Sequence, residues 1–268
     1  MRVPIYQVDA FTTHIFGGNP AAVCPLTTWL PHRILQSVAQ ENNLAETVYF
    51  VDTGDHFAIR WFTPEGEIDL CGHATLAAAH IIFQTLRPEW NTVVFRSPSH
   101  EILTVRREPG TGVYAMDFPA WTMQPCQAPA EIVAAMGCKP LTAFENRDLI
   151  LIYPDERTVA ALAPHVAFMP VGRYECIIAT APGTSADFVS RVFCPGASVA
   201  EDPVTGSAHC SLIPYWAKKH NRTVLHAHQI SARGGEIDCV YRGNRVTMRG
   251  QAVTFMQGMF ELPQECML

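Results

Sequence analysis

A glutamate at the start of an apolar segment is the first side chain suited to general acid/base chemistry. Glu46 follows the polar residues 41–43 and precedes the apolar segment 47–51, which predicts a buried strand. A carboxylate at the mouth of such a strand lies beside apolar residues, and this desolvation raises a carboxyl pKa toward neutrality. A solvent-exposed glutamate at a strand end would have the same local sequence. The residues alone leave both interpretations open.

A second group of candidates lies in a segment that occurs twice in the chain. Residues 60–64 (RWFTP) are followed by an acidic loop and Gly72, and residues 191–195 (RVFCP) are followed by an acidic loop and Gly206. In each copy the R-x-F-x-P motif ends an expected strand and the glycine opens an expected helix. The repeat predicts two related lobes with a cleft between them.

The helix starts at Gly72 and Gly206 are candidate binding groups. The first backbone N–H groups of a helix have no partner within the helix and carry the positive end of its dipole. Two such helix ends facing one cleft would bind a substrate carboxylate. A glycine can also serve only to permit a tight turn, so the argument depends on there being two matched copies.

Three polar side chains flank these helix starts. His73 directly follows Gly72, where the helix dipole disfavours a cation, so we expect a neutral donor or relay unless the ring only caps or packs. Ser207 is its counterpart in the second copy, and the simpler alternative is an ordinary N-cap. Asp202 precedes Pro203, which favours an extended conformation that directs the carboxylate out of the turn. A solvated or capping role is its alternative.

The elements that must position these side chains form a mixed α/β chain. Periodicity and turn residues predict strands at 4–11, 46–52, 56–63, 91–97, 100–107, 112–118, 148–153, 173–180, 187–194, 236–241 and 245–256. They predict helices at 31–41, 73–86, 129–136, 155–162 and 207–220. Strands joined by short turns favour antiparallel meanders over βαβ units.

We therefore expect an α+β fold of two pseudo-symmetric lobes, residues 1–115 and 116–268. Each lobe is expected to be a curved, mostly antiparallel sheet around a central helix, 73–86 in the first and 207–220 in the second. The final strand could cross back into the first lobe.

Composition excludes several classes of function. The chain has 268 residues, 48% of them hydrophobic and 16% charged, with a net charge of −6 and no basic run that would bind nucleic acid. The small basic cluster at 242–245 (RGNR) suits a hairpin turn. The apolar stretch 76–83 is too short to span a bilayer. Nine cysteines without a C-x-x-C motif are typical of a reduced protein, and the N-terminus has no apolar signal core. We expect a soluble cytoplasmic protein.

Four motifs, in order along the chain, carry a resemblance to a known family. They are DAFT with FGGNPAAV (9–12 and 16–23), NLAET (43–47), DLCGHAT (69–75) and EDPVTGSA (201–208). With these motifs the sequence resembles the PhzF-like phenazine-biosynthesis protein family, which has the diaminopimelate epimerase fold. The resemblance extends over almost the whole chain and implies a homodimeric isomerase that needs no cofactor.

The resemblance also implies roles for individual residues. In the family's namesake a glutamate moves a proton within a dihydro-hydroxyanthranilate ring, and that residue corresponds to Glu46. The catalytic partners correspond to His73 and Asp202, and the substrate-binding positions to Gly72, Gly206 and Ser207. Many members have serine where this chain has Ala45, so a hydrogen bond in the pocket could be missing here. The expected function is general acid/base proton transfer on a small carboxylate-bearing substrate.

Two alternatives remain open, an epimerase or racemase of an amino-acid-like substrate and a non-catalytic carboxylate-binding protein. Cys71-Gly72 resembles a segment of diaminopimelate epimerase that carries one of its two catalytic thiols. The second thiol would fall near Thr205, which has none, and Cys71 is either a thiolate at a helix start or an apolar filler. His226 and His228 share a strand face but have no third ligand at a characteristic spacing, so we expect no metal.

Overall fold

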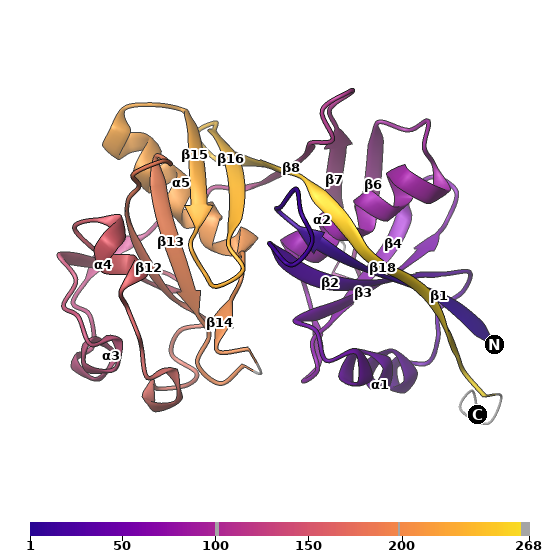
Figure 1. Cartoon of the computed structure of the whole chain (residues 1–268), viewed down its shortest axis with the longest axis horizontal. Coiled ribbons are helices and arrows are strands. Elements are labelled where there is room, and N and C mark those ends of the chain that lie inside the picture. The colour runs from indigo at the N-terminus through magenta and orange to yellow at the C-terminus, as the bar shows by residue number, and fades with distance from the viewer. Residues whose placement is uncertain (100–101, 198, 264–268) are drawn as a thin grey trace. The chain divides into compact units, whose positions relative to one another are not determined.

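The computed structural model describes residues 1–99, 102–197 and 199–263 (Figure 1). Contacts divide the chain into unit 1, Met1–Asp117 with Arg249–Leu268, and unit 2, Phe118–Met248. Each unit has helices packed on β-sheet, and the C-terminal strand lies in unit 1 beside the N-terminal one. None of the helices in the described part of the chain is long and apolar enough to cross a membrane.

Unit 1 contains most of the N-terminal half and the last strand. Its strands are β1 (Arg2–Ala10), β2 (Asn19–Leu26), β3 (Glu46–Asp52), β4 (Phe57–Phe62), β5 (Glu67–Ile68), β6 (Thr92–Arg96), β7 (Ile102–Arg107), β8 (Tyr114–Pro119) and β18 (Ala252–Glu261). β8 extends two residues beyond the unit boundary. Its helices are α1 (His32–Asn42) and α2 (Gly72–Ile81), and a π-helical turn, η1 (Ile82–Leu86), continues α2.

Unit 2 contains the remaining elements. Its strands are β9 (Gln124–Cys126), β10 (Thr142–Glu145), β11 (Leu149–Ile152), β12 (Ile177–Pro182), β13 (Phe188–Phe193), β14 (Glu201–Asp202), β15 (Val224–Gln229), β16 (Gly235–Tyr241) and β17 (Arg245–Gly250). β17 crosses the unit boundary at its last two residues. Its helices are α3 (Ala130–Met136), α4 (Glu156–Ala160), the 3-10 turn η2 (Val166–Phe168) and α5 (Gly206–His220).

The central helix of unit 1 is buried on all sides. Every residue of α2 from His73 to Ile81 is buried, as expected for a helix that is apolar around its whole circumference. It contacts β1, β2, β3 and β18. β1 pairs antiparallel with both β18 and β2, and β2 pairs parallel with β3. The start of α2 is therefore held against the sheet that carries Glu46.

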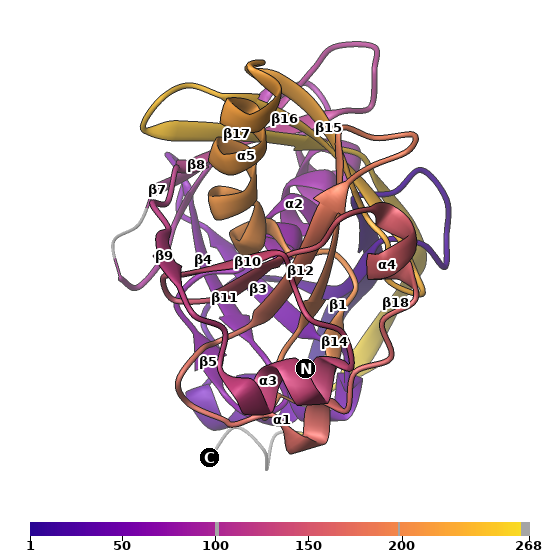
Figure 2. The same cartoon turned by 90° about the vertical axis from the view of Figure 1, so that its left-hand side faces the viewer.

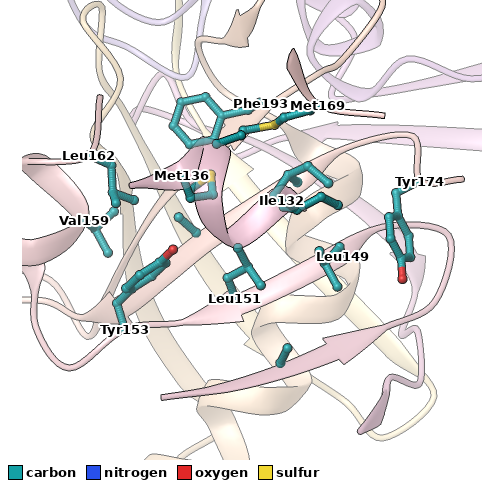
Figure 3. Close-up of a cluster of buried hydrophobic side chains, with 14 of the residues drawn as sticks. Ile132, Met136, Leu149, Leu151, Tyr153, Val159, Leu162, Met169, Tyr174 and Phe193 are labelled. Atoms are coloured by element: carbon teal, nitrogen blue, oxygen red, sulfur yellow. The ribbon is translucent and has the colours of Figure 1, made fainter. Parts of the chain in front are cut away.

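In unit 2, α5 packs against β15 and β16, as Figures 1 and 2 both show. Pro214 lies inside this helix and has no N–H to donate to the carbonyl of Cys210. The backbone N–H of Trp121 donates to that carbonyl instead, at 2.9 Å. On the other side of the unit, Ile132 and Met136 of α3 pack on Leu151 of β11 within a buried cluster (Figure 3).

The two units contain the same arrangement of strand, acidic loop and helix. β4 pairs antiparallel with β3 and β5 and parallel with β6, while β13 pairs antiparallel with β12 and β14 and parallel with β15. The registers also match, because Phe62 lies opposite Glu67 in unit 1 and Phe193 lies opposite Glu201 in unit 2. α2 follows the first arrangement and α5 the second.

The arginine of each R-x-F-x-P motif closes the acidic loop that follows it. Arg60 donates from Nε and Nη2 to the two carboxylate oxygens of Glu67, both at 2.6 Å. Arg191 donates in the same way to Glu201, at 2.7 and 2.8 Å. Each guanidinium also lies over the ring of the phenylalanine two positions later, at 5.1 and 5.0 Å from the ring centroid. The repeated motif thus fixes the turn that leads to each helix.

The expectation of meanders without βαβ units was wrong. β2 and β3 are parallel and are joined through α1, and β11 and β12 are parallel and are joined through α4. β2 did not stand out in the sequence because Pro20 and Pro25 lie within it, and proline is disfavoured inside strands. Antiparallel pairs are still the more numerous in the described chain.

The single strand expected at 245–256 is two strands. β17 ends at Gly250 and β18 begins at Ala252. Between them the carbonyl of Gln251 accepts from the N–H groups of Phe11 and Thr12, at 2.8 and 3.3 Å. Gln251 therefore belongs to neither strand and separates β17 from β18. The turn at residues 242–245 joins β16 to β17 as expected, with Gly243 at φ 76°.

Substitution of Arg191 tests the role of its loop-closing ion pair. The side chain is 13% exposed, and its Nη1 also donates to the carbonyl of Leu162 at 2.6 Å. Arg191→Lys keeps the charge but loses the two-point contact. We expect a loss of about 1–3 kcal/mol, measured by urea unfolding. The control Arg106→Lys, in an exposed pair with Asp117, should change stability by less than about 0.5 kcal/mol. Equal losses would contradict the assignment.

Candidate functional site

Glu46 is the first residue of β3. α1 ends at Asn42, and its C-cap residue Asn43, with a φ of 48°, turns the chain out of the helix. Three residues after Asn43, Glu46 pairs with Ala21 of the parallel strand β2. The residues from Thr47 to Phe50 are buried, and the Glu46 side chain itself is only 16% exposed. The carboxylate therefore lies at the mouth of a buried strand, which is the first of the two arrangements that the sequence left open.

His73 contacts this carboxylate from the first turn of α2. Its Nε2 lies 2.9 Å from Oε2 of Glu46, and the ring is buried. The two atoms are at ion-pair distance, but neither has an aligned hydrogen bond within the described chain. A carboxylate and an imidazole, each with capacity to bond a further group, thus lie together in unit 1.

The other ring nitrogen of His73 has two neighbours. The Nδ2 atom of Asn19 lies 3.2 Å from Nδ1, and Sγ of Cys71 lies 3.4 Å from it. Asn19 is the first residue of β2 and is fully buried. Sequence reasoning did not select Asn19, although it lies in the FGGNPAAV segment. A buried amide that can present either NH2 or C=O matches either protonation state of the ring.

The electrostatic setting of His73 differs from what its place in the helix suggests. Burial alone would lower the pKa of the ring, but the contacts with Cys71 and with the Glu46 carboxylate raise the His73 pKa well above its usual value. The direction favours a cation over the neutral donor expected from the sequence. The helix-dipole argument did not include Glu46, which lies 27 positions earlier in the chain and is brought to the ring only by folding.

Cys71 is the N-cap residue of α2 and is buried. Burial, followed by the nearby Glu46 carboxylate, raises the pKa of its thiol. A raised pKa keeps the sulfur protonated at neutral pH, so the thiolate considered for this helix start is disfavoured. The side chain makes no capping hydrogen bond. The N–H groups of the first turn, beginning at Gly72, can therefore still bind an anion.

Asp202 lies shortly before the helix start of unit 2, three residues ahead of the N-cap of α5. It is the last residue of β14, so its backbone is extended, as Pro203 predicted. Its Oδ2 accepts from the hydroxyl of Thr205 at 2.5 Å. The side chain of Gln229 donates to the backbone carbonyl of Asp202 at 2.7 Å and accepts from the N–H of Thr205 at 2.9 Å. The turn before α5 is thus held by side chains on both sides.

Gly206 opens α5, and Thr205 is its N-cap residue. The N-cap alternative for Ser207 is therefore wrong, because Ser207 is the second residue of the helix. Thr205 occupies the position that Cys71 occupies in unit 1. The N-cap carbonyls are also used alike, since Thr75 donates its hydroxyl to Cys71 and His209 places Nδ1 2.8 Å from the carbonyl of Thr205.

The structure therefore brings three of the expected residues together in unit 1, namely Glu46, Gly72 and His73. It places the other three, Asp202, Gly206 and Ser207, around the start of α5 in unit 2. Within unit 1 the group has a carboxylate, an imidazole and a helix N-terminus. This combination can take up a proton while stabilising negative charge on a bound molecule.

Glu46, Cys71 and His73 could also act as metal ligands. Their ligand atoms all lie within 4.8 Å of one another, and three protein ligands with an open fourth position are typical of catalytic zinc. The sequence had directed attention to His226 and His228 instead. His226 places Nδ1 2.9 Å from the carboxylate of Asp238. The metal-ligand geometry thus coincides with the acid/base group and not with the histidine pair.

Comparison with known proteins places the chain in a family. Residues 8–258 match the family described as phenazine biosynthesis-like protein. An uncharacterized isomerase of Pseudomonas aeruginosa is 45% identical over 98% of this chain and 100% of its own length. The crystal structure of a PhzF-family phenazine biosynthesis protein from Enterococcus faecalis has a TM-score of 0.93 and 44% identity, covering 98% of this chain and 100% of that one.

A more distant structure shares the fold alone. A hydroxyproline epimerase from Agrobacterium vitis has a TM-score of 0.62 at 8% identity, covering 99% of this chain and 95% of that one. The epimerase-like fold class expected from the sequence is confirmed by these likenesses. The motifs that carried the resemblance lie within the matched range, and the match extends over nearly the whole chain. The protein belongs to the phenazine biosynthesis-like (PhzC-PhzF) family.

Proposed function

We propose that this protein is an isomerase that moves a proton between two carbons of a small carboxylate-bearing substrate, with Glu46 as the acid/base. The observation that carries the proposal is the 2.9 Å contact between Glu46 Oε2 and His73 Nε2 at the buried start of α2. A protein site that only binds a substrate carboxylate has no need of a carboxylate of its own, because like charges repel. The Glu46 side chain therefore favours catalysis over simple binding.

The proposed reaction uses side chains alone. The Glu46 carboxylate takes a proton from one carbon of the substrate and returns it to another. His73, as a cation, stabilises the negative charge that develops while the proton is on Glu46. The N–H groups at Gly72 offer a site for the substrate carboxylate. General acid/base transfer of this kind requires neither a redox group nor a Lewis acid.

The names of relatives support the same class of reaction. Several relatives that are at least 41% identical over nearly the whole chain are called isomerases. The roles of Asp202 in orienting the substrate, and of Gly206 and Ser207 in binding it, stay part of the proposal, as do a homodimer and a cytoplasmic location. A two-thiol epimerase mechanism has less support, because Thr205 stands where a second thiol would be needed and Cys71 is held protonated.

Replacement of Glu46 tests the acid/base assignment. Glu46→Gln keeps the size of the side chain but cannot exchange a proton with carbon. We expect kcat to fall by ~10²–10⁴-fold, with little change in substrate binding. The assay is deuterium uptake from heavy water by a library of small carboxylates, followed by kinetics on the compound that exchanges.

Three variants serve as comparisons for this test. Glu41→Gln, on the exposed end of α1, should behave as the wild type. Asp202→Asn should reduce kcat less than Glu46→Gln does. Normal turnover by Glu46→Gln with an inactive Asp202→Asn would make Asp202 the base, and an inactive Cys71→Ser with an active Glu46→Gln would favour the thiol mechanism.

The charge on His73 can be measured without a substrate. In the wild type its pKa should lie above 6.5, and in Glu46→Gln it should fall, because burial remains while the carboxylate charge is lost. Long-range ¹H–¹⁵N NMR across a pH series gives both the pKa and the tautomer. Since the folded pKa is raised, the pair stabilises the fold below about pH 6.5, and this contribution is lost as pH rises through the folded pKa. An unchanged pKa in the variant would contradict the pairing.

Chelation separates the acid/base mechanism from a metal mechanism. We expect turnover to survive dialysis against EDTA, because proton transfer by Glu46 needs no Lewis acid. Metal content by mass spectrometry and turnover should be measured on the same samples. Loss of both, with recovery on adding one divalent metal, would indicate a metal held by Glu46, Cys71 and His73. In that case Cys71→Ser should lower the metal content.

A further inference from the structure

Two cysteines of unit 2 place their sulfurs in direct contact. Cys176 immediately precedes β12 and Cys194 immediately follows β13, one position beyond the paired residues Ile177 and Phe193. Their Sγ atoms lie 3.0 Å apart, and both residues are half-buried. The two thiols are thus opposed across the end of an antiparallel strand pair, and neither residue is fully buried.

The backbone on each side of this contact is anchored. The N–H of Cys176 donates to the buried carboxylate of Asp148 at 3.2 Å, and its carbonyl accepts from Leu149 at 3.0 Å. The N–H of Cys194 donates to the carbonyl of Ala200 at 3.0 Å. Because both main chains are fixed, the sulfurs face each other as a consequence of strand register and not of a mobile loop.

The repeated arrangement of the two units shows which position of unit 1 corresponds to the Cys176–Cys194 contact. Phe62 of β4 and Phe193 of β13 occupy equivalent positions in the two units. The β3 residue opposite Phe62 is preceded by Glu46, and the β12 residue opposite Phe193 is preceded by Cys176. Unit 2 therefore carries a thiol at the strand position where unit 1 carries its candidate acid/base, with a second thiol directly opposite.

We propose that Cys176 and Cys194 are a redox modification site, at which a small-molecule disulfide such as oxidised glutathione converts the two thiols into a reversible intramolecular disulfide. The overall reaction joins Sγ of Cys176 to Sγ of Cys194, releases two protons from the thiols and reduces the small disulfide to two thiols. Both atoms and electrons therefore balance. The sulfurs need to approach by roughly 1 Å to reach disulfide bonding distance.

The oxidation proceeds by two thiol–disulfide exchange steps. One of the two sulfurs attacks the small disulfide as the thiolate and releases one thiol, and this step forms a mixed disulfide. The second sulfur, held 3.0 Å away, then loses its proton, attacks the first sulfur and displaces the second thiol.

The bond would form beside a segment to which the proposed function assigns a role. Val192, two residues before Cys194, lies opposite Asp202 in the β13–β14 register. A disulfide would fix the start of the chain that leads from Cys194 to Asp202. Formation of the bond, however, depends only on the two thiols, so this inference can be tested whether or not the isomerase proposal is correct.

The experiment is an equilibrium titration of the full chain with glutathione. Fully reduced protein is incubated in buffers of increasing oxidised-to-reduced glutathione ratio, quenched with acid, alkylated and digested, and the peptides are quantified by mass spectrometry. We expect alkylation of Cys176 and Cys194 to be lost together, with appearance of the cross-linked peptide. The half-buried Cys126 and Cys138 should stay alkylated. Excess reduced glutathione should restore the thiols.

Single variants test whether the two thiols act as a pair. In Cys176→Ser the resolving thiol is gone, so a glutathione adduct should accumulate on Cys194. In Cys194→Ser an adduct should accumulate on Cys176 for the same reason, and neither variant should give a cross-linked peptide. Absence of the 176–194 cross-link at every ratio in the wild-type protein would overturn the proposal, as would oxidation of Cys126 or Cys138 at the same ratios.

Discussion

The site in unit 1 depends on the contact between the Glu46 carboxylate and the His73 imidazole. Each group would be costly to bury alone, because a charge taken out of water without a partner loses its hydration. Together they lie 2.9 Å apart at the junction of β3 and α2. The contact requires β3 to lie parallel to β2 and α2 to pack on the same sheet, and both conditions are met in unit 1.

The scaffold beneath this contact occurs in both units with different side chains. In both units an arginine near the end of a strand forms an ion pair that closes an acidic loop, and a helix begins a few residues later. What differs is the chemistry placed on it. Unit 1 has a carboxylate at the first residue of β3 and a cysteine at the helix N-cap, whereas unit 2 has a cysteine just before β12 and a threonine at the helix N-cap. One framework can thus present acid/base groups or thiols at the same strand position.

Burial shifts the pKa values of the neighbouring Cys71 and His73 side chains in opposite directions. It raises the pKa of the Cys71 thiol, so the sulfur stays neutral, and it lowers the pKa of His73, where the contacts with Cys71 and the Glu46 carboxylate outweigh it. His209 in unit 2 is equally buried, and there burial outweighs the hydrogen bond with the Thr205 carbonyl and lowers the pKa to about 4. The pKa of a histidine near a helix start is therefore set by its neighbours more than by its place in the helix.

The sequence by itself determined the helices, most of the long strands, the repeated motif and the residues around Glu46, His73 and Asp202, because periodicity and turn chemistry are local. The tertiary structure decided what local patterns do not encode. It formed the proline-containing strand β2, which placed Asn19 against His73, and it brought Glu46 to the ring, which raises the His73 pKa. It also set Cys176 opposite Cys194. These contacts join residues far apart in the chain, and they form only when the sheet register and helix packing are complete.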